Sequence, residues 1–306
     1  MQHRHITLFL SLLLAAVCIF MTVNLITIYK KSAYLPDETV DSIVSILAGD
    51  NIRIDPDIIP TKRENGTVYV CNSADYNRTV AQLLGDSLSK AEYVIPDGSL
   101  IVLENGAMVE FGGSFSFRYS AEGNSFGDVF SVNGLTDVAN GEIFTDVADT
   151  VVEFLDSGSR EFDTSNIDIV TVVESVREKD GVYYVYCTRT LNGVAVTGNY
   201  AHCTVSGGHV TNAEGTWSFL TLGQSYSSQL SDLFNILFHV RKEIKSAARE
   251  SLCTVTITSI DLCYSLYFYG EDEEFCLIPC WQIATDICGN YIYNALDSTL
   301  YTNNSH

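Results

Sequence analysis

The chain has 306 residues and a formal net charge of −21 at pH 7. All 38 acidic residues lie after position 33, whereas three of the 17 basic residues precede it, so the body (residues 34–306) is strongly acidic. This charge excludes a nucleic-acid-binding protein, which needs a basic patch, and a body that lies flat on anionic lipid.

An apolar segment follows a five-residue stub at the N-terminus. Residues 6–29 contain no Asp, Glu, Lys or Arg. About 20 apolar residues at 1.5 Å each cross a hydrocarbon core of roughly 30 Å. The segment also lacks the small-residue site of a cleaved signal peptide. We therefore expect an uncleaved transmembrane helix, a cytoplasmic stub at 1–5 and an extracytoplasmic body, although the flanking basic residues alone do not decide the orientation.

Small residues recur along one side of this expected helix. They follow the spacing i, i+4, i+7, i+11 and are Ser11, Ala15, Cys18 and Thr22. Small side chains let two membrane helices approach closely. Such residues are also common in membrane helices in general, so the stripe has two interpretations: ordinary composition, or a surface that docks against a partner helix.

Periodicity and turn signals divide the body into helices and strands. Apolar residues at helical spacing predict helices over 37–50, 77–91, 142–156 and 230–250. Apolar runs between Gly, Asn-Gly or Asp-Gly turns predict strands. The predicted strands cover 67–70, 92–95, 100–103, 108–111, 114–119, 167–176, 182–190, 194–205, 209–219, 253–268, 275–285 and 291–296.

The order of these elements predicts an α+β fold. We expect an N-terminal transmembrane helix followed by antiparallel sheets, each packed with helices, in a helix-plus-sheet module that recurs after Glu142 and after Leu230. The Gly-rich stretch 123–134 is the expected boundary between an N-terminal α+β domain, residues 34–134, and a C-terminal α+β domain with two modules, residues 135–302.

The cysteines and acidic runs do not predict a metal site. Eight cysteines in an outward-facing body permit disulfides, but there is no C-x-x-C pair, and most lie in apolar strands, where a thiol is a small buried hydrophobe. Cys276, Cys280 and Cys288 have no nearby His to complete a zinc site. The acidic run 271–274 is typical of a solvated hairpin tip rather than a calcium loop.

Catalytic signatures are also absent from the sequence. It contains no G-x-S-x-G, P-loop, H-E-x-x-H or G-x-G-x-x-G pattern. We therefore expect no enzymatic activity, no catalytic residue and no cofactor. The alternatives are an anchored cell-envelope enzyme, and an adhesin or structural surface protein.

Two segments of the body suggest a family. They are Val40–Pro60, and Cys276–Leu300 with its Pro279 and Trp281. With a single N-terminal apolar segment, this layout resembles the YycI/YycH group of regulatory proteins of Gram-positive bacteria. The last segment is also similar to the PepSY-type helix-plus-sheet repeat.

The resemblance implies a regulator without enzymatic activity. Such a protein would bind and modulate the sensor histidine kinase of a two-component system that controls cell-wall metabolism, together with a paralogous membrane-anchored regulator. On this chain, the implied partner contacts are the apolar segment, with its stripe of small residues, and the strand around Trp281.

Overall fold

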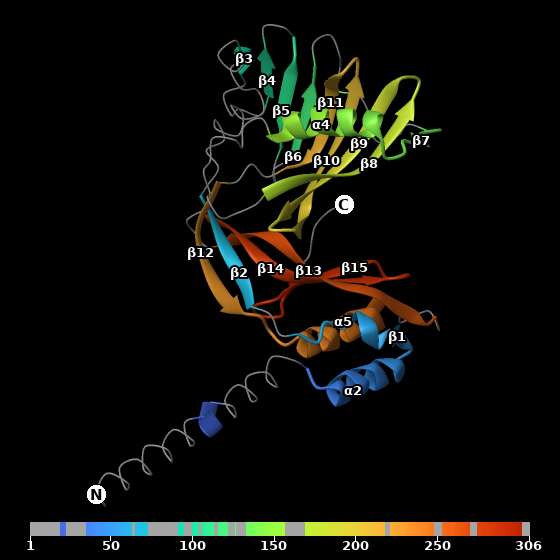
Figure 1. Cartoon of the computed structure of the whole chain (residues 1–306), viewed down its shortest axis with the longest axis vertical. Helices are drawn as coiled ribbons and strands as arrows, with labels where there is room; N and C mark the ends of the chain where they lie inside the picture. The colour runs from blue at the N-terminus through green and yellow to red at the C-terminus, as the bar shows by residue number, and fades with distance from the viewer. Residues whose placement is uncertain are drawn as a thin grey trace, which may run out of the picture. The chain divides into compact units, whose positions relative to one another are not determined.

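A computed structural model gives the fold, which is dominated by strands (Figure 1). It describes residues 19–22, 35–62, 65–72, 91–94, 100–103, 106–112, 116–121, 126, 133–156, 169–217, 221–247, 253–269 and 274–301. These residues belong to two compact units. The first comprises Met1–Gly66, Ser228–Asp261 and Trp281–Thr302, and the second comprises Thr67–Ser227, Leu262–Cys280 and Asn303–His306. The predicted domain boundaries, 34–134 and 135–302, stay a prediction.

The elements follow one another in a simple order along the chain. The helices are α2 (Asp37–Ala48), the 3-10 turn η1 (Pro56–Ile58), α4 (Glu142–Asp156) and α5 (Leu233–Ala247). The first eight strands are β1 (Ile52–Ile54), β2 (Asn65–Asn72), β3 (Ala91–Val94), β4 (Leu100–Leu103), β5 (Met108–Phe111), β6 (Ser116–Ser120), β7 (Thr136–Asp137) and β8 (Ile169–Lys179). The other eight are β9 (Val182–Leu191), β10 (Val194–Ser206), β11 (His209–Thr216), β12 (Thr221–Gln229), β13 (Val255–Tyr269), β14 (Glu274–Thr285), β15 (Asn290–Asn294) and β16 (Leu300–Tyr301).

The strand pairing corrects the predicted fold class. The sixteen strands belong to one hydrogen-bonded sheet, whose main path is β12-β2-β14-β13-β10-β11-β6-β5-β4-β3. It is a mixed sheet, because β1 and β10 each pair with β13 in parallel. The expectation of separate antiparallel sheets, each packed with helices in repeated modules, is therefore wrong. Local periodicity identifies a strand but not the strands with which it pairs. The long strands β13 and β14 pair with β10 and β2, which lie far from them in the sequence.

The structure also corrects the membrane interpretation. None of the helices in the described parts of the chain is long and apolar enough to cross a membrane. The helical stretch described within the apolar segment covers only residues 19–22. The transmembrane helix and signal anchor predicted at 6–29 are therefore not found among the described helices; the rest of that segment lies outside the described residues.

Tight turns set the register of the long hairpins in the second unit. Asp180-Gly181 joins β8 to β9, and Asn192-Gly193 joins β9 to β10. All four residues have positive φ, between 51° and 78°. Two-residue turns of this kind need φ > 0 at both central positions, which Asn, Asp and Gly tolerate best. The hairpin predicted from Asn192-Gly193 is confirmed.

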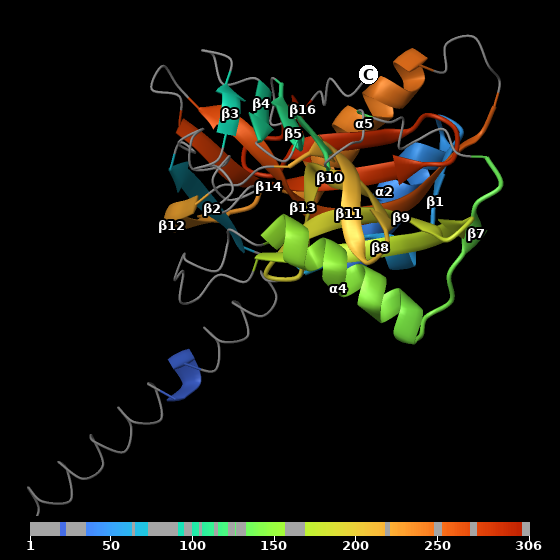
Figure 2. The same ribbon diagram turned by 90° about the horizontal axis from the view of Figure 1, so that it is seen from above.

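Helix α4 covers one face of the sheet in the second unit (Figure 2). Its boundaries coincide with the predicted helix 142–156. Val147, Val151 and Leu155 form its buried stripe and belong to one core with alternate residues of the neighbouring strands, among them Val185 and Cys187 of β9. Apolar residues repeat with a period of 3.6 in the helix and 2 in the strands, so each element has one apolar face, and these faces pack against each other.

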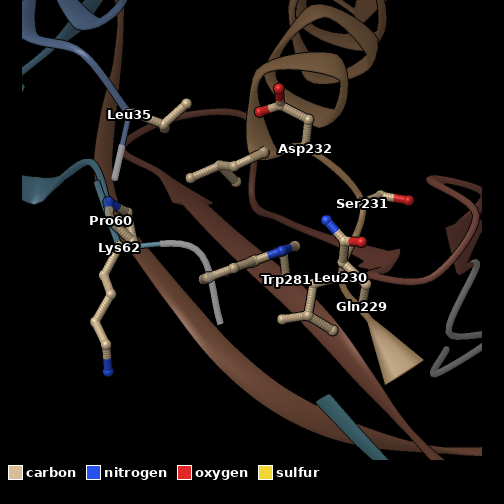
Figure 3. Close-up of a pocket in the computed structure, with 9 residues that line it drawn as sticks. Leu35, Pro60, Lys62, Gln229, Leu230, Ser231, Asp232 and Trp281 are labelled. Atoms are coloured by element: carbon tan, nitrogen blue, oxygen red, sulfur yellow. The ribbon is translucent and has the colours of Figure 1, made fainter. Parts of the chain in front are cut away.

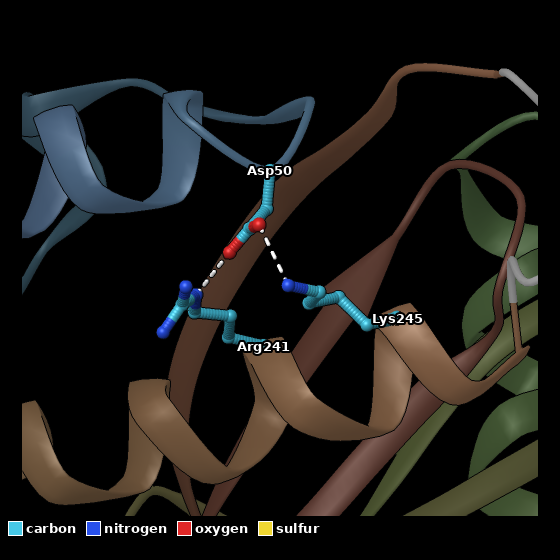
Figure 4. A network of polar contacts seen from close by, with 3 residues as sticks. All are labelled: Asp50, Arg241 and Lys245. Atoms are coloured by element: carbon cyan, nitrogen blue, oxygen red, sulfur yellow. Dashed lines mark hydrogen bonds and ion pairs between the residues drawn. The ribbon is translucent and has the colours of Figure 1, made fainter.

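An acidic residue links the N-terminal part of the first unit to α5 (Figure 4). Asp50 follows α2 and accepts hydrogen bonds from Arg241 Nε and, at 2.8 Å, from Lys245 Nζ. The two basic residues are four apart on α5 and therefore share one face. The hydrogen bonds from Lys245 and then Arg241 lower the pKa of the Asp50 carboxyl.

We predict that Gly215→Ala destabilises the protein. Gly215 of β11 pairs with Ala201 of β10, and a Cβ at this position would overlap the carbonyl oxygen of Tyr200 and lie 2.9 Å from Ala201 Cα. Overpacking of this kind costs about 1–3 kcal/mol of unfolding free energy, measured by chemical denaturation. The control is Gly49→Ala, where φ is −60° and the nearest atom would be 3.4 Å away. Equal stabilities of the two variants would contradict the described backbone.

We also predict a pH-dependent effect of Asp50→Asn. Because the folded pKa of Asp50 is lowered, its contribution to stability is present above the unfolded value of about 3.8 and is lost as the pH falls through the folded pKa. Thermal unfolding should therefore show a lower Tm for Asp50→Asn at pH 7 and a shrinking difference below about pH 4. The exposed Asp41→Asn on α2 is the control. A difference in Tm that stays constant with pH would contradict the ion pairs of Asp50 with Arg241 and Lys245.

Candidate functional site

A small pocket opens in the first unit around the side chain of Trp281 (Figure 3). We call it the Trp281 pocket. It is lined by Leu35, Pro60, Lys62, Gln229, Leu230, Ser231, Asp232, Leu233 and Trp281. Its volume is about 100 Å³. Pockets for drug-sized ligands measure about 300–1,000 Å³, and a cavity of roughly 150 Å³ holds a benzene molecule. The space therefore suits one side chain rather than a cofactor.

Backbone hydrogen bonds hold the rim of the pocket in place. Leu35 N donates to Thr61 O at 2.7 Å, which fixes the start of α2 beside Pro60 and Lys62. On the other side, Ser231 Oγ donates to Leu296 O at 2.7 Å. Asp232 caps α5, because its Oδ1 accepts from Phe234 N at 3.1 Å. The rim is thus assembled from three segments that are far apart in the sequence.

Trp281 lines the pocket from strand β14. Its side chain is 6% exposed, and its Nε1 is buried without a hydrogen-bond partner. In Figure 3 the indole lies between the Pro60–Lys62 side and the Gln229–Ser231 side. An indole N–H can only donate, and a buried donor without an acceptor costs about 1–3 kcal/mol. The same state is found at Nε1 of Trp217 in the second unit, so it is a property of the packing of both indoles.

The chemistry of the lining suits binding. Leu35, Pro60, Leu230 and Leu233 are apolar, while Lys62 and Asp232 are exposed at the mouth. The hydroxyl of Ser231 donates to a backbone carbonyl. A nucleophilic hydroxyl would instead donate to a general base.

The buried titratable groups of the second unit belong to its packing. Burial raises the pKa of Cys187 to about 12 and lowers that of His202 to about 4. Arg189 stacks over Trp217 at 4.5 Å from the ring centroid and lies 3.7 Å from Asp156. Among the residues that the structure describes, no three His, Cys, Asp or Glu side chains are placed to hold a metal ion.

The predicted partner-binding residues fall in different parts of the chain. Trp281 lies in the pocket, and Thr22 lies in the helical stretch 19–22. Ser11, Ala15 and Cys18 lie outside the described residues, as do the acidic residues 271–273. The predicted helix 77–91 also lies outside them except for Ala91, which begins β3. The role of all five residues in binding a partner stays a prediction.

Sequence reasoning missed most of the pocket. It placed Leu230 inside the fourth helix, whereas α5 begins at Leu233. The Ser231-Asp232 pair carries an N-cap signal that would have moved the helix start to its observed place. No local sequence pattern predicts that Leu35 and Pro60 lie beside Trp281, because their proximity depends on the pairing of strands that are far apart in the sequence.

Comparison with known proteins identifies no family. No family model and no curated protein matches the chain. The solved structure of an uncharacterized protein from Eubacterium rectale is similar, with a TM-score of 0.46 and 10% sequence identity, over 87% of this chain and 98% of that chain. The resemblance to the YycI/YycH group stays a prediction.

Because the indole N–H has no hydrogen-bond partner, we predict that Trp281 can be replaced by Phe with little loss of stability. Trp281→Phe removes that donor and keeps most of the apolar contact, so we expect the unfolding free energy to change by less than about 1 kcal/mol. Trp281→Ala should cost about 3–5 kcal/mol, because it empties a buried site. Chemical denaturation measures both. A loss above about 2 kcal/mol for Trp281→Phe would indicate that the N–H has an acceptor in the free protein.

Proposed function

We propose that this protein is a non-enzymatic regulator that binds a protein partner, and that the Trp281 pocket is a docking point for that partner. One observation carries the proposal: the pocket has a volume of about 100 Å³ and four apolar lining residues, which suits a single side chain of a partner. A side chain that fills such a pocket removes its own apolar surface from water. Anchors of this kind supply much of the binding energy of protein–protein interfaces.

The first partner to test is the extracytoplasmic part of a sensor histidine kinase that controls cell-wall metabolism. Support for this partner comes from the resemblance of Val40–Pro60 and Cys276–Leu300 to the YycI/YycH group. A paralogous regulator would take part in the same complex. Regulation would follow if the protein contacts one state of the kinase better than the other, since only differential binding shifts an equilibrium.

We predict that the partner is recovered with the full chain and lost when the pocket is filled. The full-length tagged protein is expressed in its native host, crosslinked and purified, and the kinase is quantified by mass spectrometry. Leu230→Trp places a larger side chain among the lining residues, and loss of a buried contact of about 1–2 kcal/mol should weaken binding by roughly 5- to 30-fold.

The matched control is Leu300→Trp, which makes the same change at an exposed leucine of the first unit. It should retain the kinase. Failure to recover the kinase with the unmodified chain, or equal recovery with Leu230→Trp, would contradict the proposed function.

A further inference from the structure

Strands with a single neighbour form the edges of the sheet. Among the described strands, these are β1, β3, β7, β12 and β16. Four of them have only two to four residues, whereas β12 has nine. A strand edge presents N–H and C=O groups that can pair with another chain, and natural proteins often keep edge strands short for this reason. Strand β12 therefore offers the longest edge for pairing among the described strands.

The sequence of β12 does not protect this edge. Charged side chains, Pro and β-bulges are the usual means of protection. Strand β12 reads Thr-Leu-Gly-Gln-Ser-Tyr-Ser-Ser-Gln and has neither a charged residue nor a Pro. Edge strand β3, in contrast, has a register shift between Ala91 and Tyr93, which is typical of a bulge. No charge or Pro of β12 therefore opposes the approach of another strand.

Both faces of β12 are accessible. It pairs with β2 (Figure 1), and its five consecutive residues Gly223–Ser227 are all exposed. Consecutive side chains of a strand point to opposite faces, so neither face of this stretch is packed in the core. We call the side of Gly223–Ser227 that faces away from β2 the open edge. A segment that pairs with the open edge does not have to displace packed side chains.

Charge favours a basic segment at the open edge. The chain has 38 acidic and 17 basic residues, so its field attracts cations. Strand β12 itself is uncharged and adds no local repulsion. Electrostatic complementarity of this kind raises the association rate and selects among partners. A segment with Lys or Arg side chains therefore suits this edge better than an acidic one.

A second copy of this chain suits the open edge less well. Each copy carries a net charge of −21, so two copies repel each other. The five residues of the open edge also fall well short of the roughly 20–30 residues that each partner contributes to a stable interface. Recognition of a single extended segment by strand addition needs only a short edge.

We propose that the open edge of β12 binds an extended, basic segment of a protein partner by strand addition. The backbone N–H and C=O groups of the segment pair with those of Gly223–Ser227, and its Lys or Arg side chains are attracted by the acidic chain. None of these five residues lines the Trp281 pocket, so the inference goes beyond the proposed function and does not rest on it.

Hydrogen exchange of the full chain tests this inference. The probe is the blocked peptide acetyl-Lys-Val-Lys-Val-Lys-amide, and exchange is followed by mass spectrometry of fragments that contain β12. At a peptide concentration of about ten times its Kd, we expect amides of the open edge to exchange about tenfold more slowly. The analogue with Pro in place of Val has the same charge but cannot pair as a strand, so it should give no protection. The analogue with Glu in place of Lys should bind at least about fivefold more weakly.

Two adjacent proline substitutions separate the open edge from the pairing with β2. The N–H groups of consecutive strand residues point to opposite sides. Of Gln224→Pro and Ser225→Pro, one therefore removes a donor at the open edge and the other removes a donor that faces β2. We expect the first kind to keep its Tm and to bind the peptide roughly tenfold more weakly, and the second kind to unfold at a lower temperature.

A pair of substitutions at Gln224 tests the role of charge without a change of backbone. Because Gln224 is exposed, both Gln224→Lys and Gln224→Glu should fold normally. Lys at this position should weaken binding of the basic peptide by about two- to fivefold, and Glu should strengthen it by a similar factor.

Several results would overturn the inference. They are unchanged exchange of β12 at millimolar peptide, equal protection by the peptide with Pro, and equal binding by the two Gln224 variants. A dimer of the full chain in light scattering that a proline variant abolishes would also overturn it, because a second copy would then occupy the open edge. Kinase recovery with Leu230→Trp is a separate readout, so this inference and the proposed function can fail independently.

Discussion

Burial of strand β14 on both faces is the constraint on which the site depends. Its consecutive residues Cys276, Leu277, Ile278, Pro279, Cys280 and Trp281 are all buried. Strands covered on both faces consist of continuous apolar runs, as this one does. Water does not reach such a strand, so any polar side-chain atom on it needs a partner within the protein. Trp281 Nε1 is a buried exception to this rule, and the Trp281 side chain lines the pocket.

The elements around β14 give the pocket its shape. All the residues that line the pocket belong to the first unit. The rim depends on the cap of α5 by Asp232 and on the hydrogen bond between Leu35 and Thr61. The link from Asp50 to Arg241 and Lys245 ties the end of α2 to the same helix. A preorganised rim lowers the cost of ordering the site when a ligand binds.

The local elements could be predicted from the sequence, but their assembly could not. Helix α4 and strands β4 and β5 were predicted with their observed boundaries, because amphipathic periodicity and turn residues are local signals. The parallel pairing of Ile52–Ile54 with Val255–Ile257 joins residues about 200 positions apart. No local pattern specifies such a pair. The prediction of helix-packed modules was wrong for this reason. For the same reason, the sequence indicated Trp281 as a candidate binding residue but not the other residues that line its pocket.

The indole N–H of Trp281 can be observed directly by NMR. The full chain, labelled with 15N at the tryptophan indole, should give two indole cross-peaks, from Trp217 and Trp281. We predict that the Trp281 signal shifts when the partner is added, because a side chain of the partner enters the pocket that the indole lines, while the Trp217 signal stays in place. A Trp281 signal that does not respond to a bound ligand would contradict the account.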